Sequence, residues 1–190
     1  MTTLYMFRHG QTDYNKDKIF TGWLDPDINE NGVKESKEIA AQLKGVVPNK
    51  AYTSDLKRAQ HTLEIVLEEI LGSKRSSVKI FIDPRLKERN YGALNGLSKE
   101  KIEKEYPKEY PLWHRSYDVA PPNGESIKDV EKRVLEFLHD VLPTFASTDV
   151  IFISAHGNSL RPIRRYFEHM SIDEMCSFEH PRAKVYKYEF

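Results

Sequence analysis

The sequence contains a single cysteine, Cys176, among 190 residues, so an internal disulfide is excluded and a reducing compartment fits. No apolar run approaches the roughly 18 residues of a membrane-spanning helix, and no secretory signal is evident at the N-terminus. Excess charge is also absent, because 29 Lys and Arg balance 29 Asp and Glu. Neither nucleic acid nor an anionic membrane is therefore an expected partner. We expect a cytoplasmic enzyme or binding protein.

Two kinds of motif are missing as well. No Gly-rich loop ends in Lys followed by Ser or Thr, so a nucleotide-binding P-loop is not supported. Five histidines form no metal-ligand spacing and receive no functional role from the sequence; they are His61, His114, His139, His169 and His180. We expect no bound metal.

The residues that are present alternate between strand and helix patterns. Apolar runs predict strands at 4–7, 51–53, 78–82 and 150–154, and the alternating tail 185–190 predicts an edge strand. Expected helices run from Asn29 or Asn31 to Leu43, from a Ser54 N-cap to Gly72, over 98–106, from a Ser126 N-cap to Pro143, and over 159–169. The segment 10–27 is expected to be a polar loop, and 83–124 to be irregular.

This alternation predicts one α/β domain over residues 1–190. Its central sheet is expected to be mostly parallel and flanked by helices on both faces. Hydrophobic residues make up 39% of the chain, which is ordinary for a protein of this class and sufficient for one core.

Two predicted strands end in the same way, at a histidine followed by glycine. The run 4–7 leads into Arg8, His9 and Gly10, and the run 150–155 leads into His156 and Gly157. In open α/β sheets, ligands bind beyond the carboxyl ends of the strands. If the two strands are parallel neighbours, both imidazoles meet at one edge, and Arg8 beside them indicates an anionic ligand. The pattern predicts an imidazole nucleophile that acts on phosphate.

Each residue of these strand ends has a specific use at such a site. Gly10 would let the backbone turn so that amides face an anion, and the planar fork of Arg8 fits phosphate oxygens. His9 can act as nucleophile if it is neutral and its other ring nitrogen is held. The helix after His156 would present its N-terminus to an anion. Alone, each histidine is at least as readily explained as an ordinary turn residue; the pairing favours a site.

Two further positions extend this hypothesis. Arg58 follows the short strand 51–53 in the first turn of a helix, so a second guanidinium would reach the same sheet edge. Glu88 lies in an irregular segment, and phosphate transfer needs an acid to protonate the leaving oxygen. From the residues alone, an exposed helix arginine and a solvated loop glutamate remain the simpler alternatives.

Taken together, these motifs resemble the histidine phosphatase superfamily, and within it the phosphoglycerate mutases that depend on 2,3-bisphosphoglycerate. The matching runs are Arg8–Thr12, Asn15 with Phe20–Trp23, Ala51–Ala59, Glu88–Lys99 and Ala155–Arg161. They cover nearly the whole chain in the family's order. The runs Phe-Thr-Gly-Trp and Glu-Arg-x-Tyr-Gly are more specific than Arg-His-Gly.

The resemblance implies interconversion of 3-phosphoglycerate and 2-phosphoglycerate in glycolysis and gluconeogenesis, without a metal and primed by 2,3-bisphosphoglycerate. It implies that His9 carries the phosphoryl group and that Glu88 is general acid and base. Arg8, Arg58 and His156 would stabilise the transferring group. The residues implied to hold the phosphorylated three-carbon acid are Asn15, Thr21, Gly22, Arg89, Tyr91, Lys99, Arg115, Gly157 and Asn158.

The chain departs from the family pattern in two places. Trp113 is followed by His114 and Arg115 where many members carry two arginines, and both the segment 118–124 and the tail are short. A more open site would admit water, so a phosphatase that uses the same residues is the first alternative. A non-catalytic phosphosugar-binding protein is disfavoured by Glu88, and a metal hydrolase by the absent ligand spacing. The edge strand leaves a homodimer or a monomer open.

Overall fold

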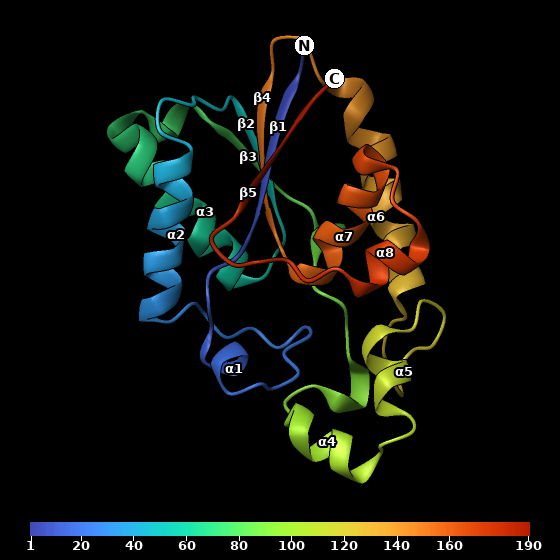
Figure 1. Ribbon diagram of the computed structural model, residues 1–190. Coiled ribbons are helices and arrows are strands. Elements are labelled where there is room, and N and C mark those ends of the chain that lie inside the picture. Colours follow the sequence, from blue (N-terminus) through green and yellow to red (C-terminus); the bar gives the residue numbers. More distant parts are fainter.

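The computed structural model describes residues 1–190 and is built around a five-stranded sheet (Figure 1). The strands are β1 (Thr3–Arg8), β2 (Lys50–Thr53), β3 (Lys79–Ile82), β4 (Val150–Ala155) and β5 (Val185–Glu189). Their order is β3-β2-β4-β1-β5. Strands β1 to β4 are parallel, and β5 runs antiparallel to β1 at an edge. The predicted fold class and all five predicted strands are confirmed.

Helices cover both faces of this sheet, as predicted. The helices are α1 (Asp13–Lys16), α2 (Glu30–Gln42), α3 (Lys57–Leu71), α4 (Lys99–Glu105), α5 (Tyr110–Arg115), α6 (Ile127–Val141), α7 (Gly157–Glu168) and α8 (Ile172–Ser177). Figure 1 shows α2 and α3 on one side, α6 and α7 on the other, and α1, α4 and α5 beyond one end of the sheet, away from both termini. No helix combines the length and apolar character needed to cross a bilayer.

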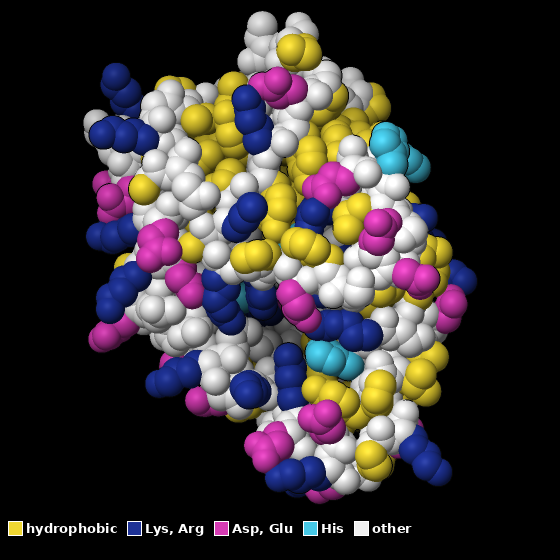
Figure 2. All heavy atoms as spheres, viewed as in Figure 1, with side chains coloured by type: hydrophobic (Ala, Val, Ile, Leu, Met, Phe, Trp, Pro, Cys, Tyr) yellow, Lys and Arg dark blue, Asp and Glu magenta, His cyan; other side chains and the backbone are white.

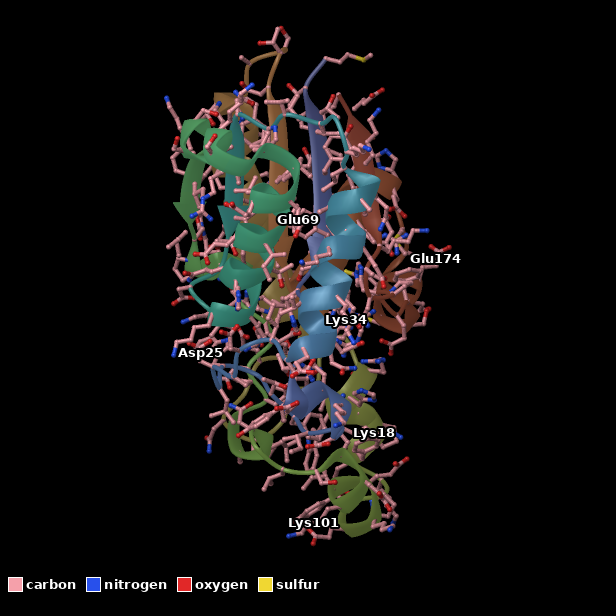
Figure 3. All side chains as sticks on the ribbon, turned by 90° about the vertical axis from the view of Figure 1, so that its left-hand side faces the viewer. Lys18, Asp25, Lys34, Glu69, Lys101 and Glu174 are labelled. Carbon is pink, nitrogen blue, oxygen red and sulfur yellow. The ribbon has the colours of Figure 1, made fainter.

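Two apolar clusters fill the layers on either side of the sheet. One packs residues of α2 and α3 against the sheet, including Ile39, Leu63 and Phe152. Figure 3 views this side, where Lys34 on α2 and Glu69 on α3 lie on the outer surface. The other cluster packs α6 and α7 against the opposite face. The helices therefore bury one stripe each, and the sheet is held rigidly between them.

Some element boundaries differ from the sequence prediction. The expected loop 10–27 contains the single-turn helix α1, while α5 and α8 have six residues each and were not predicted. Such short helices carry too few residues for a periodic apolar pattern. Helix α7 begins at Gly157 rather than Ser159. Helix α3 begins at Lys57 with Leu56 at the N-cap, so the prediction that Ser54 caps it is wrong.

The N-cap predicted for α6 is confirmed. The Ser126 hydroxyl accepts the amide proton of Asp129 at 3.1 Å, and the Asp129 carboxylate accepts the Ser126 amide proton at 2.8 Å. This reciprocal capping box satisfies two of the amides that a helix start leaves unpaired. It begins α6 just after the irregular segment that carries Glu88, and thereby positions that segment next to the sheet edge.

Candidate active site

The two His-Gly strand ends lie side by side. Strands β1 and β4 are parallel neighbours, with Arg8 paired to Ala155 in the register. His9 and His156 are the next residues, and their ring centroids are 5.0 Å apart with planes at 54°. The amide of His9 donates to the carbonyl of Ala155 at 3.0 Å, which fixes the backbone at this point. The prediction that two imidazoles meet at one sheet edge is confirmed.

A pocket opens at the carboxyl ends of these two strands. Figure 2 shows it as a hollow rimmed by Lys and Arg side chains. Of the site residues expected from the sequence, those on its lining are Arg8, His9, Asn15, Thr21, Gly22, Arg58, Glu88, Tyr91, Lys99, Arg115, Gly157 and Asn158. His156 lies behind the lining and is fully buried. We call His9, Arg58, Glu88 and His156, with Arg8 beside them, the floor of the site.

The hydrogen bond of His9 determines which ring nitrogen is free. Its Nδ1 lies 2.7 Å from the carbonyl oxygen of Gly10, which can only accept, so Nδ1 carries the proton and Nε2 keeps its lone pair. Burial, and then the charges of Arg58 and Arg8, lower the pKa of His9 well below its ordinary value. His9 is therefore a neutral imidazole with a free Nε2, as a nucleophile requires.

Gly10 serves this arrangement in a different way from the one predicted. Its amide donates to the Thr62 hydroxyl at 3.0 Å and is not available to a ligand. A Cβ at Gly10 would meet the carbonyl oxygen of Gly32 at 2.3 Å. Glycine is needed here because the start of α2 packs directly against the strand end. The sequence predicted that amides at this turn would face an anion, and the Gly10 amide is not one of them.

His156 is held through Ser54. The Ser54 hydroxyl lies 2.7 Å from Nε2 of His156, and both residues are fully buried. Burial, followed by the positive charge of Arg58 and the proximity of the His9 ring, lowers the pKa of His156 well below its ordinary value. If the hydroxyl donates to Nε2, the ring proton is on Nδ1, which is buried and has no partner within the protein. A neutral His156 can then donate to an anion.

The two floor arginines retain buried donors that the protein does not satisfy. Arg58 donates to the carbonyls of Leu24 and Gly22 at 2.8 Å each, which holds the predicted substrate loop against α3. The Nε atoms of Arg8 and Arg58 are buried without a partner. Burial lowers the pKa of Arg58 to about 10, so it stays charged at neutral pH. Unpaired buried cationic donors are costly, and an anion would satisfy them.

Glu88 is a buried, ionised carboxylate held by donors from α7. Its Oε1 accepts the Asn158 amide at 3.2 Å, the Asn158 side-chain nitrogen at 3.0 Å and the Arg89 amide at 2.7 Å. Burial raises the pKa of Glu88, but Arg8 and these donors outweigh burial, so the net pKa lies below its ordinary value. At least one amide at the start of α7 therefore serves Glu88, although the sequence predicted that it would face a ligand.

His9, Glu88 and His156 also have the composition of a metal site. One ligand atom from each lies within 4.8 Å of the other two. They come from three distant segments, so a search for local ligand spacing could not find them. Arg8 and Arg58 adjoin this cluster and lower the pKa of His9. The same field opposes a cation and favours an anion.

A second set of lining residues has a different character. We call it the outer wall, and its residues are Lys99, His114, Arg115, Arg161 and Glu179. Lys99 lies over the Phe20 ring, 5.5 Å from its centroid. Burial lowers the pKa of His114 to about 3, so this ring is neutral. The wall is therefore cationic apart from one carboxylate.

Several pocket residues were not assigned by the sequence prediction. Arg161 lies three positions after Asn158 in α7, so helical spacing could have placed it on the same face. It is buried, its Nη1 donates to the Met175 carbonyl at 2.6 Å, and its Nε has no partner. Glu179 and His180 reach the lining from the segment before β5, where no local pattern indicated it.

Arg89 is the predicted substrate residue that the structure places elsewhere. It is fully buried, and it is absent from the pocket lining. Its guanidinium donates to the carbonyls of Glu125, Val119 and His114 at 2.6, 3.2 and 3.4 Å. Arg89 therefore ties together the irregular segment that carries Arg115.

Comparison with known proteins agrees with this geometry. A family model described as "Histidine phosphatase superfamily (branch 1)" matches residues 4–190. The "2,3-bisphosphoglycerate-dependent phosphoglycerate mutase" of Nitrobacter winogradskyi is 42% identical over 180 residues, covering 93% of this chain and 86% of the relative. A "Phosphoglycerate mutase" of Schizosaccharomyces pombe is 41% identical, with 93% and 84% covered.

Solved structures with the same fold bear other names. "Bacillus stearothermophilus YhfR" superposes with a TM-score of 0.85 at 28% identity, covering 98% of this chain and 90% of the other. A mycobacterial glucosyl-3-phosphoglycerate phosphatase in complex with VO3 has a TM-score of 0.84 at 25% identity, covering 97% and 91%. The sequence relatives thus carry the name of mutases, and this structural neighbour that of a phosphatase.

Proposed function

The chain belongs to the histidine phosphatase superfamily, and from this premise we propose that it interconverts 3-phosphoglycerate and 2-phosphoglycerate as a 2,3-bisphosphoglycerate-dependent mutase. This reaction belongs to glycolysis and gluconeogenesis, so we also propose a cytoplasmic location. The observation that carries the proposal is His9, a neutral imidazole whose Nδ1 is tied to Gly10, so that Nε2 is free, with Arg8, Arg58 and Glu88 close to the ring.

His9 and Glu88 divide the chemistry between them. With the phosphoryl group on Nε2 of His9, a substrate hydroxyl attacks phosphorus, and the P–N bond breaks as the new P–O bond forms. The hydroxyl proton passes to Glu88, which starts as the ionised base because its pKa is lowered. In the reverse direction, Glu88 returns the proton to the leaving oxygen. Neither step needs a group beyond the floor residues.

The remaining floor residues stabilise charge on the transferring group. Arg8 and Arg58 present fixed cationic donors, and His156 donates through Nδ1 when Ser54 occupies its Nε2. These donors are buried and positioned before the reaction, so little reorganisation is needed at the transition state. The loop residues Thr21 and Gly22 are held next to them through Arg58.

The donor set fits a ligand with anionic groups at both ends. Unpartnered Nε atoms of Arg8 and Arg58 lie on the floor, and the unpartnered Nε of Arg161 lies with Arg115 and Lys99 on the outer wall. These residues would hold 2,3-bisphosphoglycerate. When bound, it supplies the phosphoryl group that charges His9. We assign the other lining residues, among them Asn15, Tyr91, Gly157 and Asn158, to substrate binding.

A phosphatase that uses the same floor is the second candidate. The mycobacterial phosphatase named above shares the fold, and His114 here replaces an arginine of the mutase pattern. One observation favours the mutase. The named relatives at 39–44% identity are mutases.

A coupled assay separates the two candidates. Isomerisation of 3-phosphoglycerate and release of phosphate are measured on the same protein, with and without 2,3-bisphosphoglycerate. We expect isomerisation to dominate and to require 2,3-bisphosphoglycerate. Phosphate release that dominates under both conditions would establish the phosphatase instead. A chelator is expected to leave isomerisation unchanged, and a loss of activity that a divalent ion restores would contradict the metal-free mechanism.

We further propose a homodimer that pairs through β3. Strand β3 is the outermost strand on one lateral side of the sheet, and all of its residues are exposed. The exposed fractions of Ile80, Phe81 and Ile82 are 48%, 42% and 56%. The amides of Lys79 and Asp83 donate towards β2, so strand alternation turns the backbone groups of Ile80 and Ile82 outward. An exposed apolar edge is a template for antiparallel pairing with a second copy.

Sedimentation analysis tests this assembly. Ile80→Lys should convert a dimer to a monomer, because it places a charge in the paired edge. Ile172→Lys on α8, a comparably exposed position away from this edge, should leave the dimer intact. A wild-type protein that sediments as a monomer at micromolar concentration would rule the dimer out.

A further inference from the structure

Glu179 is a carboxylate in a pocket built for anions. It lies in the segment between α8 and β5, and it pairs with Arg115 at the end of α5. Its second oxygen lies 3.8 Å from Nη2 of Arg161. The ion pair therefore joins two segments of the pocket lining that are far apart in the sequence.

The environment of Glu179 differs from that of Glu88, the other carboxylate on the lining. Glu88 is buried and held by three donors, whereas the Glu179 side chain is 68% exposed and held only by arginines. No backbone amide or neutral side chain donates to Glu179 among the hydrogen bonds of the structure. Its carboxylate is therefore free to leave its partners.

The partners of Glu179 are the donors that a substrate acid group needs. Arg115 and Arg161, with Lys99, make the outer wall cationic. A phosphoglycerate whose phosphate lies on the floor extends its other acid group towards this wall. Glu179 and that acid group are both carboxylates, so they compete for the same guanidinium donors.

We propose that Glu179 is an internal counter-ion that competes with the second acid group of the substrate for Arg115 and Arg161. With Glu179 in place, a ligand gains the donors of the wall only if it carries an anionic group that takes the place of the Glu179 carboxylate. This role rests on the proposed function, because it assumes that the floor takes the phosphate. It makes Glu179 a residue that sets selectivity and ligand release, with no part in phosphoryl transfer.

The ion pair of Glu179 is weak enough for the substrate carboxylate to displace it reversibly. Exposed ion pairs contribute a factor of about 1.5 to 5 in an equilibrium constant. A substrate carboxylate on a preorganised wall exceeds this, so it displaces Glu179 on binding. The returning Glu179 then assists release of the product, since it reoccupies the arginines as the ligand leaves.

Two ligands of matched size isolate this effect. Glycerol 3-phosphate has the chain and phosphate of 3-phosphoglycerate but a hydroxymethyl group in place of the carboxylate. Titration calorimetry gives the Kd of each for the wild type and for Glu179→Gln. We expect the substitution to tighten 3-phosphoglycerate binding about two- to fivefold and to leave glycerol 3-phosphate unchanged. Glu68→Gln is the control, because Glu68 forms an exposed ion pair with Arg75 on α3 and the following turn, outside the pocket lining.

Binding measurements with the same two ligands can also contradict the proposal. Unchanged or weaker binding of 3-phosphoglycerate to Glu179→Gln, or equal tightening of both ligands, would overturn the proposal. In an Arg115→Ala background the effect of Glu179→Gln should shrink, and an undiminished effect would also overturn it. These measurements need no turnover, so they remain decisive if the protein proves to be a phosphatase. Lack of isomerase activity would reject the proposed function only.

Discussion

The floor of the pocket and the Arg115–Glu179 pair of the outer wall hold their side chains by opposite means, whereas Arg161 of the wall is buried and tied to backbone carbonyls. The floor residues His9, Glu88 and His156 are each at most 7% exposed and are fixed by hydrogen bonds to backbone or buried side chains. The wall residues Arg115 and Glu179 are 30% and 68% exposed and hold each other. The difference indicates that bond making is assigned to fixed groups and ligand discrimination to groups that can exchange partners.

The fold explains this division. The floor lies at the carboxyl ends of β1 and β4, which are inner strands of the sheet. Helices pack on both faces of these strands, so the side chains there have little freedom to move. The wall is contributed mainly by short helices and by the segment before β5. Substitutions on the floor should therefore lower kcat, and substitutions on the wall should change KM.

The largest expected effect is the loss of the nucleophile. His9→Ala should lower kcat by at least about 10⁴-fold, because the phosphoryl group has no acceptor on the enzyme. The measurement is isomerisation of 3-phosphoglycerate, together with acid-labile phosphate on the protein after incubation with 2,3-bisphosphoglycerate. His61→Ala, an exposed histidine on α3, is the control. Retention of a tenth of the activity without His9 would refute the mechanism.

A smaller effect is expected from Ser54, whose hydroxyl contacts His156 and also accepts the Leu56 amide proton at 3.3 Å. Ser54→Ala should lower kcat about 10- to 100-fold, less than removal of a transition-state donor outright, while KM stays unchanged. Nitrogen-15 chemical shifts of His156 should report a change in the protonated ring nitrogen, and Ser54→Thr should restore both readouts. Wild-type shifts in Ser54→Ala would mean that the hydroxyl does not select the tautomer.

On the wall, Arg115→Ala should raise the KM for 3-phosphoglycerate about tenfold, within the range for a hydrogen bond to a charged group. The kcat should change by less than about threefold, because Arg115 does not touch the transferring group in the proposed mechanism. Steady-state kinetics provide both numbers. A kcat that falls as far as KM rises would remove the distinction between floor and wall.

The smallest effect concerns pH and His180, a buried residue beside the wall. Burial, then Arg161 and Arg8, lower the pKa of His180 to about 2. Between its ordinary pKa of about 6.5 and that value, the unfolded chain binds one proton more than the folded chain. The free energy of unfolding therefore falls as the pH falls below about 6.5, by about 1.4 kcal/mol per pH unit for this group.

Replacement by an aromatic ring removes that contribution. The His180 ring packs edge-on against Phe178 and Tyr186, so His180→Phe should be accommodated. Urea unfolding between pH 7 and 5 should show a shallower pH dependence for His180→Phe than for the wild type. His139→Asn, at an exposed position on α6, is the control for the replacement of a histidine. Equal slopes for all three proteins would show that His180 does not titrate on unfolding.

Much of the floor was predictable because its signals are local. Each histidine lies at the end of an apolar run, and Arg58 and Glu88 belong to short motifs that carry the family resemblance. The sequence also predicted the parallel sheet and the helix layers, since their periodic patterns extend over many residues. Short helices such as α1, α5 and α8 were missed, because a single turn or two carries no such pattern.

What the sequence by itself determined is which residues end the strands, and thus where two imidazoles and Arg8 meet; Arg58 and Glu88 joined them only through the family resemblance. Only the tertiary structure decided how each one is used. The Ser54–His156 contact joins residues 102 apart in sequence, and Arg115–Glu179 joins residues 64 apart. Such contacts depend on how separate elements pack, which no local periodicity encodes. The contact of His156 with Ser54, the positioning role of Arg89 and the ion pair on the wall all follow from that packing.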